Sequence, residues 1–142
     1  MKFVIRDLVT QLCTKYNTKN PFELADCLNI IVFFHDLHEE INGFYKCEEG
    51  NKFIAINNNL SETMQRTVCA HELGHAVLHE EVNTLFLRKN TFLSVDRLEI
   101  EANTFAAFLL IDKNTIIPGD TKKCIAYKNN IPIELLKFYK IY

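Results

Sequence analysis

Three histidines recur at four-residue intervals in the stretch from Cys69 to Glu81, which reads CAHELGHAVLHEE. Its first part, from His71 to His75, has the form HExxH. Side chains four residues apart on a helix lie on one face about 6 Å apart, so two imidazoles can bind one Zn²⁺ at about 2.0 to 2.1 Å. Glu72 lies about 100° further round the helix, where it can reach a water molecule beside the metal. The pattern therefore predicts a hydrolytic zinc site.

The alternative is an ordinary core helix that is rich in histidine. A shuffled sequence of this composition contains one HExxH with a probability of roughly one to two per cent. Buried polar groups without partners also cost on the order of 1 to 3 kcal/mol each, whereas a bound metal removes that cost. The two histidines continue a stripe that faces the core, formed by Met64, Val68, His71, His75 and Leu78. These observations favour the metal site, and Gly74 in mid-helix indicates a close approach of another backbone.

A catalytic zinc ion takes three protein ligands, so a third donor is needed. His79 lies about 12 Å from His71 along a helix, and we expect it to be a hydrogen-bond partner, a capping residue or a surface histidine. Glu99 is the better candidate, because it heads a core-facing stripe of the next predicted helix. Asn103, one turn on, could accept a hydrogen bond from a ligating imidazole and fix its tautomer. Glu101 points elsewhere and is expected to be a solvated surface acid.

Two long helices must position these residues. The first is predicted from about residue 62 to 80, after the N-cap Ser61. The second is predicted from about residue 95 to 111, after the N-cap Ser94. Residues 81–93 mix apolar and basic side chains without clean periodicity, so we expect an ordered loop there.

Shorter elements surround the two helices. Apolar spacing predicts an amphipathic N-terminal helix, and the Asn20-Pro21 pair predicts a second helix that runs to about Leu28. Strands are predicted at residues 30–34, 43–47 and 52–57, and short closing helices at residues 121–128 and 132–139. The expected class is α+β, with a small, mostly antiparallel three-stranded sheet packed on the HExxH helix and the Glu-bearing helix.

Length, charge and cysteine usage narrow the class of protein. The 142 residues fit one domain, residues 1–142, and the net charge of -2 argues against a general nucleic-acid or membrane binder. Five separate cysteines suit free thiols, and no signal peptide or membrane-spanning run is visible, so a cytoplasmic protein is expected. The basic tail, residues 121–142, offers a DNA-binding element as one interpretation, but a solvated face that closes the core is the simpler one.

The motifs resemble those of the ImmA/IrrE family of metallopeptidases. AHELGHAVLH followed by EIEANTFAAFLL is similar to the family pattern of HExxH on one helix and ExxAN with FAA on the next, and NPFELADCLNI, INGFY, NKFIAINNNLS and IPIELLKFYK are also similar. The helix exit differs, because Ile111-Asp112 stands where the family often has Met-Pro. The resemblance implies a zincin-like fold with one Zn²⁺ on His71, His75 and Glu99, Glu72 as catalytic base, and Asn103 beside the ligands.

The resemblance also implies a function. The chain looks like the compact type carried by phages and integrative elements, whose members cleave the transcriptional repressor of that element, here expected to be a helix-turn-helix protein. The alternative is a zinc-containing module that sequesters a repressor or toxin without cleaving it. Glu72 argues against this alternative, because a purely structural zinc site has no use for a general base.

The sequence does not decide two features of a peptidase site, namely the strand that binds the substrate and the residue that contacts the transition state. An extended substrate could pair with an edge strand of the sheet, for which residues 43–47 are our prediction. A transition-state or substrate contact could come from Tyr45, His35, His38 or His79, with Tyr45 and His79 as the first candidates.

Overall fold

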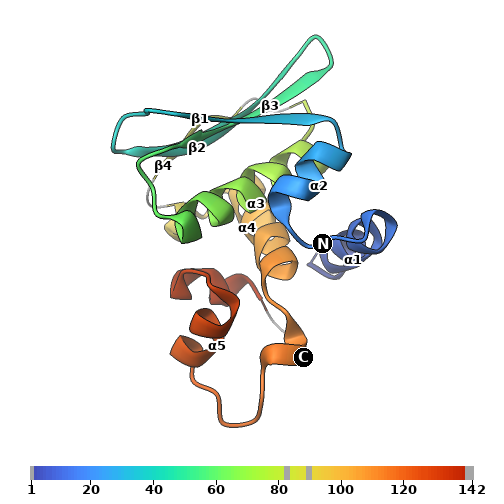
Figure 1. Cartoon of the computed structure of the whole chain (residues 1–142), viewed down its shortest axis with the longest axis vertical. Coiled ribbons are helices and arrows are strands. Elements are labelled where there is room, and N and C mark those ends of the chain that lie inside the picture. The colour runs from blue at the N-terminus through green and yellow to red at the C-terminus, as the bar shows by residue number, and fades with distance from the viewer. Residues whose placement is uncertain (1, 82–83, 89–90, 140–142) are drawn as a thin grey trace.

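A mixed sheet lies over the helix that carries the HExxH motif, and a second long helix crosses beneath that helix (Figure 1). The computed structural model describes residues 2–81, 84–88 and 91–139. In chain order the elements are α1 (Lys2–Tyr16), α2 (Pro21–Cys27), β1 (Ile30–His35), β2 (Ile41–Glu48), β3 (Asn51–Asn57), α3 (Glu62–Leu78), β4 (Thr84–Arg88), η1 (Thr91–Leu93), α4 (Arg97–Leu110), η2 (Lys113–Thr115), α5 (Lys122–Asn129) and η3 (Ile133–Phe138).

The described strands form one sheet in the order β1-β3-β2-β4. β1 pairs parallel with β3, whereas β2 pairs antiparallel with both β3 and β4. The α+β class is confirmed, but the prediction of three strands is wrong, because β4 lies in the segment that was expected to be a loop. Thr84 of β4 pairs with Tyr45, far away in the chain, and register shifts interrupt the ladder. Local periodicity therefore gives little sign of this strand.

The fourth strand changes the position of β2 in the sheet. β2 lies between β3 and β4, so the prediction that residues 43–47 form an edge is wrong. Among the described strands, β1 and β4 are the outer ones. An extended partner that adds to the sheet would have to pair with one of these two.

Capping residues set the starts of the two central helices. Ser61 caps α3 as predicted, since its hydroxyl accepts a hydrogen bond from the backbone N–H of Met64. Asp96, not Ser94, caps α4, because its carboxylate accepts from the N–H groups of Leu98 and Glu99. Ser94 instead accepts from the N–H of Asp96 and so orders the approach to the helix. The negative charge of the Asp96 carboxylate also stabilises α4, because it lies at the positive end of the helix dipole.

Two glycines allow α3 to lie close to both of its neighbours. A Cβ at Gly74 would lie 3.0 Å from Cβ of Phe105 and 3.1 Å from the carbonyl oxygen of Ala102, which confirms the predicted close approach to α4. On the sheet side, a Cβ at Gly43 would meet the backbone of Ala55 and lie 2.8 Å from Cγ1 of Val68. The middle of α3, Thr67 to Ala76, is consequently buried between the two layers.

The terminal elements complete the core around α4. Ile5 and Val9 of α1 are buried, as the amphipathic pattern predicts. At the other end of the chain, α5 and η3 correspond to the predicted closing helices, and Leu135 and Phe138 of η3 are buried. In the described part of the chain, no helix is both long and apolar enough to cross a membrane.

Candidate metal centre

The two histidines of the HExxH motif face Glu99 across the α3–α4 contact. Nε2 of His71 lies 3.1 Å from one carboxylate oxygen of Glu99, and Nε2 of His75 lies 2.9 Å from the other. Both imidazoles are almost fully buried, whereas the Glu99 side chain is 24% exposed. The three donor groups therefore converge at one point, and solvent reaches that point along Glu99.

A contact with Asn103, on the side of the His71 ring away from Glu99, fixes the tautomer of His71. Nδ1 of His71 lies 2.7 Å from the amide oxygen of Asn103, a group that only accepts hydrogen bonds. In the neutral imidazole, Nδ1 therefore carries the proton and Nε2 carries the lone pair that points toward Glu99. Nε2 of His71 is buried, and among the described residues no contact of this atom has hydrogen-bond geometry, although a Glu99 oxygen lies 3.1 Å away. A nitrogen lone pair that faces a carboxylate repels it unless a cation lies between them.

The spacing of the donors fits a zinc ion. Two zinc bonds of about 2.0 to 2.1 Å at a tetrahedral angle separate their ligand atoms by about 3.3 Å. The observed N···O separations of 2.9 Å and 3.1 Å are slightly shorter, so a small outward shift of the Glu99 carboxylate would admit the ion. Two imidazoles and one carboxylate are also donors that zinc commonly takes in catalytic sites.

Glu72 completes the buried cluster. Its side chain is fully buried, and a carboxylate oxygen of Glu72 lies within 4.8 Å of ligand nitrogens of His71 and His75. These three residues form a candidate metal site of the HExxH type. Glu72 follows His71 directly along α3, so its side chain leaves the helix about 100° further round than that of His71.

The two imidazoles differ in their affinity for protons. Burial lowers the pKa of His75 below its usual value, and the adjacent His71 and His79 rings add to that effect. Burial also lowers the pKa of His71, but the carboxylates of Glu99 and Glu72 outweigh it, so the pKa of His71 is raised overall. The neutral form that binds a metal is thus favoured at His75, and a proton competes with the metal at His71.

The role expected for Glu101 is wrong. Glu101 is not a solvated acid: it is buried, and its Oε1 lies 2.8 Å from Nε2 of His79. Nδ1 of His79 in turn lies 3.0 Å from Nδ1 of His75. The first turn of α4 lies beside the end of α3, which brings the side of α4 opposite Glu99 into contact with His79. The four-residue spacing of the three histidines was a signal for this contact, because it places His79 next to His75 on the helix.

The other candidate contacts lie apart from the metal cluster. Tyr45 is fully buried in the sheet, and its hydroxyl donates a hydrogen bond to the carbonyl oxygen of Glu80 at 2.7 Å. Burial raises the pKa of the Tyr45 phenol. His35 and His38 are exposed and make local hydrogen bonds, with Asp36 and Glu40 respectively. Of the four candidates, His79 is the one whose ring the structure places against a histidine of the cluster.

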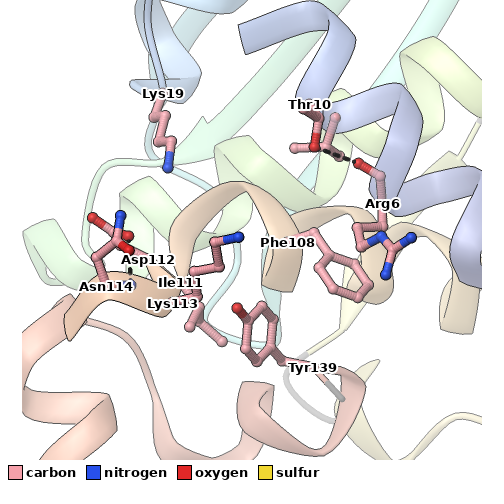
Figure 2. A pocket seen from close by; sticks show the side chains of 10 residues that line it. Arg6, Thr10, Lys19, Phe108, Ile111, Asp112, Lys113, Asn114 and Tyr139 are labelled. Carbon is pink, nitrogen blue, oxygen red and sulfur yellow. Dashed lines mark hydrogen bonds between the residues drawn. The ribbon is translucent and has the colours of Figure 1, made fainter. Parts of the chain in front are cut away.

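A separate hollow lies beside α1, at the end of α4 (Figure 2). Arg6, Lys19 and Lys113 bring three basic side chains to its walls, and Phe108 and Tyr139 add aromatic surface. None of the residues that line it belongs to the metal cluster. This hollow is therefore not the position of the chemistry that the HExxH motif indicates.

Comparisons with known proteins agree with the geometry of the cluster. Residues 25–129 match the family described as the IrrE N-terminal-like domain, peptidase family M78. The chain is 47% identical over 139 residues to the uncharacterized immunity region protein 2 of Bacillus phage phi105, an alignment that covers 93% of this chain and 86% of the relative. It is 33% identical over 136 residues to the metallopeptidase ImmA of Bacillus subtilis (strain 168), covering 90% of this chain and 79% of the relative. With its buried HExxH cluster, the chain thus belongs to the IrrE N-terminal-like family of metallopeptidases.

Proposed function

We propose that this protein is a zinc-dependent endopeptidase that cleaves one specific protein, the helix-turn-helix repressor of a phage or other mobile element. The observation that carries the enzymatic part is the convergence of His71, His75 and Glu99, with the buried carboxylate of Glu72 beside them. The repressor is supported by the motif pattern and by the relative whose name assigns it to a phage immunity region.

In this proposal His71, His75 and Glu99 hold the zinc ion, and Asn103 fixes the tautomer of His71. Bound there, the ion would polarise the scissile carbonyl and lower the pKa of the attacking water. Glu72 accepts the proton of that water and passes it to the departing amine, as a general base and then a general acid.

An extended substrate segment would reach the site along β4. Thr84 at the start of β4 pairs with Tyr45, and the Tyr45 hydroxyl donates to the carbonyl oxygen of Glu80, two residues after the end of α3. β4 is also an outer strand among those described, whereas β2 has strands on both sides. Main-chain hydrogen bonds to β4 would hold the substrate extended, with its scissile bond near Glu99.

The test is incubation of the zinc-loaded protein with the repressor encoded beside its gene, followed by electrophoresis and mass spectrometry of the products. Cleavage at one position by the wild-type protein, but not by Glu72→Gln, would support the proposal. Stable binding of the repressor without cleavage by either protein would favour sequestration instead. Generic substrates such as casein are poor probes, because a peptidase specific for one protein can leave them intact.

A further inference from the structure

We infer that His79 and Glu101 are positioning residues for the metal site, and that they fix the tautomer and the ring orientation of His75. This inference rests on the proposed role of His75 as a metal ligand. A histidine that binds a metal through one nitrogen normally donates the N–H of its other nitrogen to a fixed acceptor. For His71 that acceptor is the amide oxygen of Asn103. For His75 the group in the corresponding position is the Nδ1 atom of His79, at 3.0 Å.

With His79 neutral, the hydrogen bonds in this chain of groups run in one direction. The carboxylate of Glu101 accepts, so Nε2 of His79, 2.8 Å away, must donate. The other nitrogen of the neutral His79 ring then carries a lone pair and accepts the proton of Nδ1 of His75. Nε2 of His75 is left with its lone pair directed toward Glu99 and the position of the metal. The Glu101 carboxylate therefore determines which ring nitrogen of His79, and in turn of His75, carries the proton.

Burial makes these contacts specific. The side chains of His79 and Glu101 are 6% and 11% exposed, so bulk water is largely excluded as a substitute partner. Arg97 is too exposed and too distant to hold Glu101 by itself, since its Nε lies 4.0 Å from Oε2 and its side chain is 83% exposed. His79 is the strong partner that the structure gives to the Glu101 carboxylate.

The backbone around His79 is also held in place. Its N–H donates to the carbonyl oxygen of His75 at 2.8 Å, so the two residues share a main-chain and a side-chain hydrogen bond. On one side, Lys52 donates to the carbonyl oxygen of Ala76, and on the other, Tyr45 donates to that of Glu80. The sheet therefore anchors the end of α3 on which His79 lies. Glu99 and Glu101 both lie near the start of α4. The same helix therefore supplies one proposed metal ligand, Glu99, and the carboxylate that supports another, His75.

The experiment compares His79→Phe with His79→Gln. Phenylalanine keeps a ring but offers no acceptor, whereas the glutamine carbonyl can accept the proton of His75 Nδ1. We expect His79→Phe to weaken zinc binding by about 10- to 100-fold in competition with a chromogenic chelator, and His79→Gln to recover part of that loss. The absorption bands of the Co²⁺-substituted protein should shift more in His79→Phe than in His79→Gln. His38→Phe, the same change at an exposed histidine, is the matched control and should bind zinc like the wild type.

A second pair of variants tests Glu101, the last residue in the hydrogen-bonded chain from His75 through His79. Glu101→Leu should weaken zinc binding in the same sense, and Glu101→Gln should do so less, because its amide oxygen can still accept from His79. Combining His79→Phe with Glu101→Leu should cost no more than the larger single loss, since both changes break one chain of hydrogen bonds. Circular dichroism of the metal-free variants separates loss of zinc affinity from loss of the fold.

Wild-type zinc affinity in His79→Phe, or equal losses in His79→Phe and His79→Gln, would overturn the inference. Additive losses in the double variant would do the same. The readout is the dissociation constant for zinc and does not depend on any substrate. A protein that binds zinc through this arrangement but cleaves no repressor would refute the proposed function and leave the positioning role intact.

Discussion

Gly74 of α3 and Ala102 of α4 lie in direct contact, and a Cβ added at Gly74 would come within 3.1 Å of the Ala102 carbonyl oxygen. This close approach is what allows Glu99, one turn before Ala102 and Asn103, to reach the histidines on the facing helix. The polar contacts of His71 with Glu99 and Asn103 of α4 both depend on it.

Gly74→Ala should destabilise the protein and weaken zinc binding together. Forcing the helices apart should cost about 1 to 3 kcal/mol, against a gain of about 1 kcal/mol in helix propensity. Urea denaturation of the metal-free protein measures the net effect, and Gly74→Val should show a larger loss than Gly74→Ala. A protein made more stable by Gly74→Ala would mean that the contact tolerates a methyl group.

Glu72→Gln should abolish repressor cleavage while the zinc content stays at one ion per chain. The amide cannot take a proton from the attacking water, and the loss of a general base typically lowers a rate by 10²- to 10⁴-fold. Cleavage is followed by electrophoresis and zinc by elemental analysis. Undiminished cleavage by this variant would assign the proton transfer to another residue.

Glu99→Gln should reduce the affinity for zinc by more than about 100-fold, because loss of a direct ligand should exceed the loss of a ligand's hydrogen-bond partner. Competition with a chelator gives the dissociation constant. Glu62→Gln, at an exposed position in the first turn of α3, is the matched control and should not change it. Equal affinities in the two variants would remove Glu99 from the metal site and leave Glu72 as the nearest carboxylate.

Removal of zinc with a chelator should lower the melting temperature, and readdition should restore it. A ligand present at 100 times its dissociation constant stabilises the folded state by about 2.7 kcal/mol, provided that it binds only that state. Differential scanning calorimetry at several zinc concentrations measures the shift. His71→Ala should melt at the same temperature with and without zinc, and a zinc-dependent shift in that variant would place the ion elsewhere.

Tyr45→Phe should act on stability and leave cleavage unchanged. The hydroxyl donates to the Glu80 carbonyl oxygen inside the protein, and the loss of one such hydrogen bond costs about 0.5 to 1.5 kcal/mol. Thermal unfolding and the rate of repressor cleavage should be measured on the same preparation. A large fall in rate with unchanged stability would return Tyr45 to the list of substrate contacts.

Local patterns predict much of what this chain does. The four-residue spacing in HExxH places His71 and His75 on one face of any helix they join, whatever lies around it. The position of Glu99 at the head of a core-facing stripe likewise directs it inward, and the structure brings it to both histidines. The helices, the first three strands and the α+β class follow from apolar periodicity and capping residues, although the cap of α4 is Asp96 instead of Ser94.

Contacts between distant segments of the chain became evident only in the tertiary structure. β4 forms through pairing with residues far upstream, so its five residues carry no local signal strong enough to predict a strand, and β2 became an inner strand as a consequence. The contact of Glu101 with His79 depends on how α4 crosses the end of α3, and periodicity within one helix does not determine a crossing. The sequence by itself thus determined that His71 and His75 share one face of a helix, with Glu72 beside them, because their spacing is local. Only the packing of α4 against α3 decided that Glu99, Asn103 and, through His79, Glu101 lie against these histidines.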